Sequence, residues 1–156
     1  ESVDRLMVVN TPLNREMMTD KMANSSLTDL ISLFASKVPE AQAALSDATK
    51  ADPAAIKASL NGGNHFGESF SRVNKQGTPC LVVNGQNDPG ITVPDDVHLS
   101  TWAHNVHQIT LANSGHFPML DEAVKFNRLL TDFLALDSGM SPRDLGLKDE
   151  WKRRVR

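Results

Sequence analysis

The sequence feature that most constrains the fold is a short apolar run, Leu81 to Val83, between a proline and a turn that ends in a carboxylate. Pro79 cannot donate a hydrogen bond to a neighbouring strand, so a strand can begin just after it. An apolar run without polar alternation is typical of a parallel-sheet strand that is buried on both faces. Gly85 permits a tight turn, which leaves Asp88 just beyond the carboxyl end of this predicted strand.

A second predicted strand, Val106 to Leu111, is followed by the segment Ser114-Gly115-His116-Phe117-Pro118. In an open parallel sheet the loops after the strands converge on one crevice. We therefore expect Asp88 and His116 to lie at the same edge of the sheet. A carboxylate that orients an imidazole, and an imidazole that moves a proton, are two of the three parts of a nucleophilic triad.

These elements, in this order, resemble the carboxyl-terminal part of an α/β-hydrolase. The resemblance rests on Asp4 to Pro12, Gly85-x-x-Asp88, Val93-Pro94, Ser114 to Glu122 and the apolar helix after them. It implies an α/β fold with about three parallel strands, flanked by helices and interrupted by a helical cap. The expected parts are a core strand over 1–12, the cap over 13–76, the carboxyl-terminal core with the acid and histidine loops over 77–138, and a basic tail over 139–156.

The family's nucleophile lies in a Gly-x-Ser-x-Gly turn that precedes all of these elements, and this chain begins after the place where that turn is expected. Gly67-Glu68-Ser69-Phe70-Ser71 is the nearest sequence, and Ser69, Asp88 and His116 have the family's chain order. Ser71 replaces the last glycine, however, and no apolar strand comes before the segment. Ser69 is therefore a weak candidate, and we expect the nucleophile to be absent from this chain.

The resemblance implies that His116 is the general base and then the general acid, with Asp88 accepting a hydrogen bond from the other ring nitrogen. Each residue also has a plainer interpretation. His116 would then be a loop histidine that bonds only backbone, and Asp88 would stabilise the turn Asn87-Asp88-Pro89-Gly90 with its own side chain. Asp95 and Asp96 lie nearby but have the pattern of helix caps.

No metal site and no cofactor are expected. His98, His104 and His107 are close in sequence, but His104 and His107 span a junction between a helix and a strand. No carboxylate or thiolate offers a convincing further ligand for a metal ion.

Local patterns predict several helices. The first runs from Leu27 to Val38, begins at a capping box of Ser26 and Asp29, and ends at Pro39. The others are predicted over Glu40 to Lys50, over Pro53 to Leu60, as one or two turns around Phe66 to Val73, from Pro94-Asp95 with Val97 and Trp102, and as an apolar helix that includes Ala123, Phe126, Leu130 and Phe133.

The net charge of −3 gives no general attraction to nucleic acid or to an anionic membrane. The single cysteine, Cys80, excludes an internal disulfide, and its apolar surroundings predict a buried, reduced thiol. No apolar run approaches the length of a membrane span. We expect a cytoplasmic location.

Two functional hypotheses remain. In the first, the chain is part of an esterase-like hydrolase whose small-molecule substrate has an apolar portion, because the cap contains small apolar residues. In the second, it is a non-catalytic homologue that acts as an assembly partner. Asp88 and His116 favour the first hypothesis, and the missing nucleophile turn favours the second. The second would act through the expected lack of a neighbour for Leu6 to Val9, since an apolar free strand edge invites association. An amino-terminal half, a partner chain or a second copy is expected to cover it.

Overall fold

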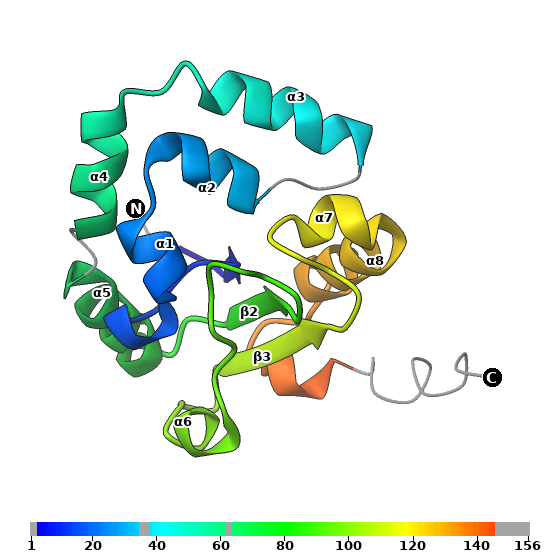
Figure 1. Ribbon diagram of the computed structural model, residues 1–156. Coiled ribbons are helices and arrows are strands. Elements are labelled where there is room, and N and C mark those ends of the chain that lie inside the picture. Colours follow the sequence, from blue (N-terminus) through cyan, green and yellow to red (C-terminus); the bar gives the residue numbers. More distant parts are fainter. Residues whose placement is uncertain (1–2, 35–37, 62–63, 146–156) are drawn as a thin grey trace.

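The computed structural model describes residues 3–34, 38–61 and 64–145. Its centre is a parallel sheet of three strands in the order β1-β2-β3 (Figure 1). The strands are β1 (Leu6–Val9), β2 (Cys80–Gly85) and β3 (Val106–Leu111). The prediction of an α/β fold with about three parallel strands is confirmed.

Helices connect the strands. Between β1 and β2 lie the 3-10 helix η1 (Arg15–Met17), α1 (Asp20–Asn24), α2 (Leu27–Leu33), α3 (Pro39–Ala48), α4 (Pro53–Asn61) and α5 (Asn64–Gln76). Helix α6 (Asp96–Ser100) joins β2 to β3, which is followed by α7 (Pro118–Asp121), α8 (Ala123–Leu134) and the 3-10 helix η2 (Pro142–Asp144). Figure 1 shows α2, α3 and α4 in an arc above the sheet.

The central strand, β2, is buried along its whole length, which confirms the prediction of a strand covered on both faces. Leu81 and Val83 face one apolar cluster, to which α8 contributes Phe126, Leu129 and Phe133. Cys80 and Val82 face the opposite cluster, which contains Leu13, Met17, Phe70 and Trp102. Each face of the sheet therefore has its own core.

Two helix predictions need correction at their ends. The capping box of Ser26 and Asp29 is present, but α2 ends at Leu33 and Phe34 is its C-cap. Pro39 does not end this helix; it is the first residue of α3, where its missing N–H has no hydrogen bond to lose. Residues 35–37, which the prediction also included, lie outside the described residues.

Two further helices differ in length from their predictions. Helix α5 runs over 13 residues rather than one or two turns, because one face of it packs Phe70 and Val73 against the sheet. Helix α6 is short, and Trp102 lies beyond its last residue, Ser100, rather than within it.

Within the described residues, β1 hydrogen-bonds to β2 alone, so its other edge has no strand beside it. Most of the predicted basic tail, 146–156, lies outside the described residues. None of the described helices has the length and apolar character needed to cross a bilayer. The division into core strand, cap, core and tail stays a prediction.

Candidate active site

The structure brings Asp88 and His116 together from the loops after β2 and β3. His116 Nδ1 lies 2.9 Å from Asp88 Oδ2. The Asp88 side chain is fully buried and that of His116 is 20% exposed. The carboxylate thus fixes one edge of the imidazole, while the opposite edge, with Nε2, stays available for proton transfer.

Asp88 combines the two interpretations that its sequence context allowed. Its Oδ1 accepts a hydrogen bond from the Gly90 backbone N–H at 2.8 Å, and its own N–H donates to the Gly85 carbonyl at 3.2 Å. Because Oδ1 stabilises the turn, Oδ2 is left for His116. The turn therefore holds the carboxylate in a fixed orientation toward the histidine.

Asn10, which the sequence reasoning missed, ties the loop of His116 to the ends of β1 and β2. Its amide nitrogen donates to the carbonyls of Gly115 and His116, at 2.9 and 2.8 Å, and its Oδ1 accepts from the Gly85 N–H at 2.8 Å. Its φ of 42° is left-handed, a region that asparagine tolerates better than most residues. The signal available in the sequence was an asparagine directly after a strand.

Gly85 lets the histidine loop approach the end of β2. A Cβ atom at this position would lie 2.0 Å from the Gly115 carbonyl oxygen and 2.6 Å from that of Ser114. Such distances are far below van der Waals contact, so only glycine fits here. The backbone that precedes His116 is thereby held against the strand that precedes Asp88.

Two consecutive carboxylates hold the histidine loop from the other side. Asp121 Oδ2 accepts from the Gly115 N–H at 2.8 Å. Glu122 accepts from Ser114 Oγ at 2.9 Å, from the Asn113 N–H at 3.0 Å and from the Lys125 ammonium. Burial opposes ionisation of Glu122, but its hydrogen bonds from Lys125, Ser114 and Asn113 outweigh burial and lower its pKa.

An aromatic side chain from the end of α2 covers the imidazole. Phe34 stacks on His116 with ring centroids 3.8 Å apart and an interplanar angle of 25°. A Cβ atom on Gly90 would lie 2.7 Å from the Phe34 ring, so the absence of a side chain there leaves room for the stack. Phe117 also contacts the imidazole, edge to face, with ring centroids 5.2 Å apart.

A cavity of about 280 Å³ opens beside this pair. Its described lining is about equally polar and apolar and comprises Leu33, Phe34, Val38, Pro89, Phe117, Gly115, His116, Asn87, Asn113 and Asp121. No serine, threonine or cysteine is among these described lining residues. In the part of the chain that the structure describes, the site therefore holds an oriented imidazole and a mixed polar and apolar lining, without a hydroxyl or thiol to activate.

The other residues considered from the sequence lie elsewhere. Ser69 is exposed on α5, where it lies 3.5 Å from the Arg72 guanidinium, and Figure 1 shows α5 on the opposite side of the view from α7. Asp95 is the N-cap of α6, as predicted, whereas Asp96 lies in its first turn. Among the described residues no group of three His, Cys, Asp or Glu side chains is arranged to hold a metal ion.

No protein-family model and no curated protein matches the sequence, but solved structures resemble it. A meta-cleavage product hydrolase from Pseudomonas fluorescens IP01 has a TM-score of 0.61 at 16% identity, over 85% of this chain and 56% of its own. A 2-hydroxy-6-oxo-6-phenylhexa-2,4-dienoate hydrolase from Rhodococcus sp. strain RHA1 gives 0.62 at 14%, over 85% and 56%.

The N-acyl homoserine lactonase AidH, complexed with N-hexanoyl homoserine lactone, gives a TM-score of 0.59 at 20% identity, over 85% of this chain and 55% of its own. At these identities the likeness establishes the fold, which is the carboxyl-terminal portion of the α/β-hydrolase fold. The chain spans a little over half of the length of these structures.

Proposed function

We propose that this chain supplies the acid and the base of a hydrolase in which a nucleophile, His116 and Asp88 cleave an ester or a related bond. The observation that carries the proposal is the 2.9 Å contact between His116 Nδ1 and a fully buried carboxylate. The two residues are 28 positions apart in the sequence, and hydrogen bonds from Asn10 and Asp121 hold the loops in place. Structural similarity to hydrolases supports the same reaction class.

In the proposed reaction with a serine or cysteine nucleophile, His116 Nε2 takes the proton of the hydroxyl or thiol as it attacks the substrate carbonyl. An aspartate nucleophile has no proton to give, and His116 then acts only on the water that hydrolyses the covalent intermediate. The imidazolium that forms is stabilised by Asp88, which does not itself take up the proton. His116 then gives the proton to the leaving group, and the covalent intermediate is hydrolysed by a water molecule that His116 activates in turn. No cofactor is required for these steps.

The apolar side chains in the lining of the cavity beside His116, which are Leu33, Phe34, Val38, Pro89 and Phe117, support a substrate with an apolar portion. The bond that is cleaved depends on the nucleophile, which is a serine, a cysteine or an aspartate. An esterase or a hydrolase of carbon–carbon bonds uses a serine or a cysteine as the nucleophile, and a dehalogenase or an epoxide hydrolase uses an aspartate. The nucleophile is proposed to come from polypeptide outside the described residues, next to the free edge of β1.

The proposed location is the cytoplasm, supported by the buried free thiol of Cys80.

The test begins with the native polypeptide that contains these residues, detected with an antibody against the chain, purified and assayed with p-nitrophenyl esters of increasing acyl length. We expect a product about twice the 17.1 kDa of this chain, with measurable esterase activity. His116→Ala should then lower kcat by about 10⁴-fold or more, and Asp88→Asn by a comparable factor, because triad members act as a unit.

His104→Ala is the matched control, since His104 is exposed and lies outside the cavity beside His116. Full activity of the His116→Ala enzyme would overturn the catalytic assignment. A native product near 17.1 kDa with no activity would instead favour the second function.

That second function is a non-catalytic assembly partner, and the observation that favours it is the edge of β1. Among the described residues this edge has no strand beside it, although Met7 and Val9 pack into the core next to it. An unpaired strand edge is a template for another strand. Size-exclusion chromatography with light scattering checks this function, which predicts a complex or a dimer rather than a cooperative monomer.

A further inference from the structure

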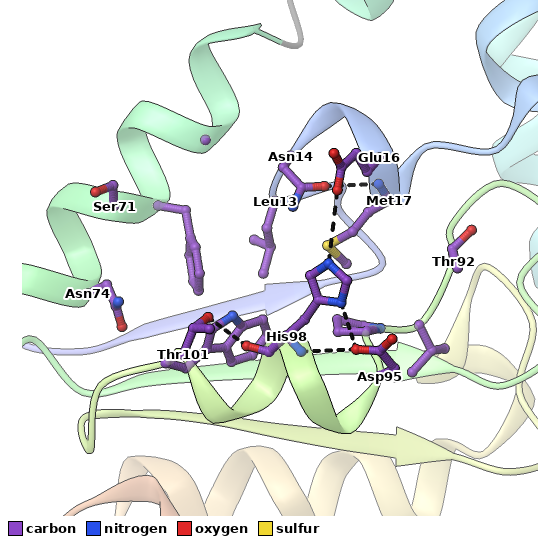
Figure 2. Close-up of a pocket in the computed structure, with 15 residues that line it drawn as sticks. Leu13, Asn14, Glu16, Met17, Ser71, Asn74, Thr92, Asp95, His98 and Thr101 are labelled. Carbon is purple, nitrogen blue, oxygen red and sulfur yellow. Dashed lines mark hydrogen bonds and ion pairs between the residues drawn. The ribbon is translucent and has the colours of Figure 1, made fainter.

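A second cavity, of about 410 Å³, lies between η1, α5 and α6 (Figure 2). It shares no lining residue with the cavity beside His116. Its volume falls within the range of small-molecule sites in proteins. The catalytic proposal does not use it.

Hydrogen bonds join the segment of Met17 and Thr19 to the segment of Pro89 to Thr92, whose two ends line different cavities. The Thr92 N–H donates to the Met17 carbonyl at 2.7 Å, and the Thr19 N–H donates to the Gly90 carbonyl at 3.0 Å. Thr19 Oγ1 adds a bond of 2.9 Å to the Pro89 carbonyl. Pro89 lines the cavity beside His116, whereas Thr92 lines the second one. These bonds thus join residues that belong to two different cavities.

The inner wall of the second cavity is apolar and aromatic. Phe70 of α5 and Trp102 meet edge to face with ring centroids 5.1 Å apart. Leu13 and Met17, each 6% exposed, close the wall on the side of η1. These side chains can take an aliphatic or aromatic group out of water.

The mouth of the cavity is acidic. Figure 2 shows the His98 imidazole between two carboxylates, with Asp95 on one side and Glu16 on the other. The ring atoms lie 2.6 Å from Asp95 Oδ1 and 3.9 Å from Glu16 Oε2. No lysine or arginine is among the described lining residues. One imidazole therefore faces two negative charges, and the surplus charge is negative.

We propose that this cavity binds a small organic cation, an ammonium group on an apolar body, with the body against Phe70 and Trp102 and the ammonium at the mouth, beside the solvent-exposed sides of the Glu16 and Asp95 carboxylates. The aromatic side chains contact the apolar body of such a ligand, and the carboxylates attract its ammonium group. A carboxylate ligand of the same shape would bring its charge toward two like charges.

The proposal is tested with three probes that share one apolar body: phenethylammonium, phenethyl alcohol and phenylacetate. Each is titrated into the isotopically labelled full chain, and the NMR signals of Trp102 and Met17 are followed. We expect the ammonium to bind at least about fivefold more tightly than the alcohol, which is the gain from one exposed charge contact, with the acetate weakest.

The double variant Glu16→Gln, Asp95→Asn should remove this order and make the three probes bind alike. Asparagine caps helices as well as aspartate does, so α6 keeps its N-cap. The matched control is Glu40→Gln, Asp47→Asn on α3, which changes the net charge equally at exposed positions away from the cavity. It should leave the order of the probes unchanged.

A second readout is the pH dependence. The titratable groups that face the ammonium are Glu16 on η1 and Asp95 and His98 on α6, while the described α5 residues of the lining are uncharged. Loss of the His98 proton with rising pH should therefore tighten binding of phenethylammonium. Equal binding of the three probes, preference for the acetate, or no shift at Trp102 up to about 10 mM probe would overturn the proposal, and none of these results bears on His116.

Discussion

Two histidine–aspartate pairs in the described part of the chain have similar contact geometry and differ in their surroundings. His116 meets Asp88 through Nδ1 at 2.9 Å, and His98 meets Asp95 through Nδ1 at 2.6 Å. The first carboxylate is fully buried, whereas the side chain of Asp95 is 65% exposed. A short contact between these residue types therefore does not by itself mark an active site.

The difference lies in how each pair is assembled. Asp95 and His98 are three residues apart at the start of α6, so helix formation alone brings them together. Asp88 and His116 are 28 residues apart and meet only when β2 and β3 pair and their loops are held in place. The distant pair forms only when the sheet and its loops are folded, whereas the local pair requires only one turn of helix.

Gly85→Ala should break the distant pair most severely. The new methyl group would meet the carbonyl oxygens of Ser114 and Gly115, which cannot move without displacing the histidine loop. We expect a loss of about 2–3 kcal/mol in the free energy of unfolding, measured with urea. The control is Gly67→Ala on α5, where the added Cβ meets no heavy atom within 4 Å and should be neutral or stabilising. Equal stability of the two variants would contradict the close approach.

Asn10→Ala should weaken the distant pair less. It removes the amide that bonds the carbonyls of Gly115 and His116 and the oxygen that accepts from Gly85, for an expected loss of about 1–3 kcal/mol. Asn10→Gly separates the causes, because glycine keeps the φ of 42° without strain but also lacks the amide. If the glycine variant were as stable as the parent in a urea titration, the hydrogen bonds of the Asn10 side chain would not contribute to the free energy of unfolding.

Glu122→Gln probes the carboxylate that holds the histidine loop, with an expected loss of about 1 kcal/mol at pH 7. Hydrogen bonds from Lys125, Ser114 and Asn113 lower the pKa of Glu122 below its ordinary 4.5 against the effect of burial. A lowered carboxyl pKa stabilises the fold above the unfolded value, and that contribution is lost as the pH falls through the folded value.

The measurement for Glu122 is the difference in unfolding free energy between the parent and the variant from pH 7 to pH 3. The difference should shrink below about pH 4.5. Asp132→Asn is the control, since Asp132 lies 3.6 Å from Arg128 at the surface and does not touch the histidine loop. A difference that grows at low pH would contradict the assigned sign.

The smallest effect is expected at the local pair. Asp95 raises the pKa of His98 above its ordinary 6.5, chiefly through their side-chain hydrogen bond. This contribution to stability is complete below the unfolded pKa and disappears as the pH rises through the folded one. Asp95→Asn should bring the pKa of His98 back toward its ordinary value in an NMR titration. Unfolding of the parent and this variant by urea should remain nearly the same, because both groups are exposed.

The sequence predicted the elements whose causes are local. Pro79 and Gly85 bracket the apolar run of β2, and Ser26 with Asp29 starts α2, so short segments were sufficient evidence for them. The meeting of Asp88 with His116 was also predictable, because parallel strands end at the same edge of a sheet.

The contacts that hold this pair in place were not predictable in the same way. Asn10 acts across more than 100 residues, and nothing near it in the chain indicates which carbonyls it binds. The stack of Phe34 on His116 depends on where α2 ends, which was misjudged because Pro39 starts a helix instead of ending one. Contacts between distant segments depend on the placement of whole elements, and errors in helix ends carry over to them.

The buried thiol of Cys80 offers a way to measure local opening of the core. Cys80 pairs with Leu6 on β1 and Val106 on β3, its side chain packs in the cluster with Leu13 and Met17, and burial raises the pKa of the thiol to about 11. A thiol that is both covered and protonated reacts with alkylating reagents only while this side of the core is open. Because it is the single cysteine of the chain, the rate of its modification would measure how often this side of the core opens, without an added label.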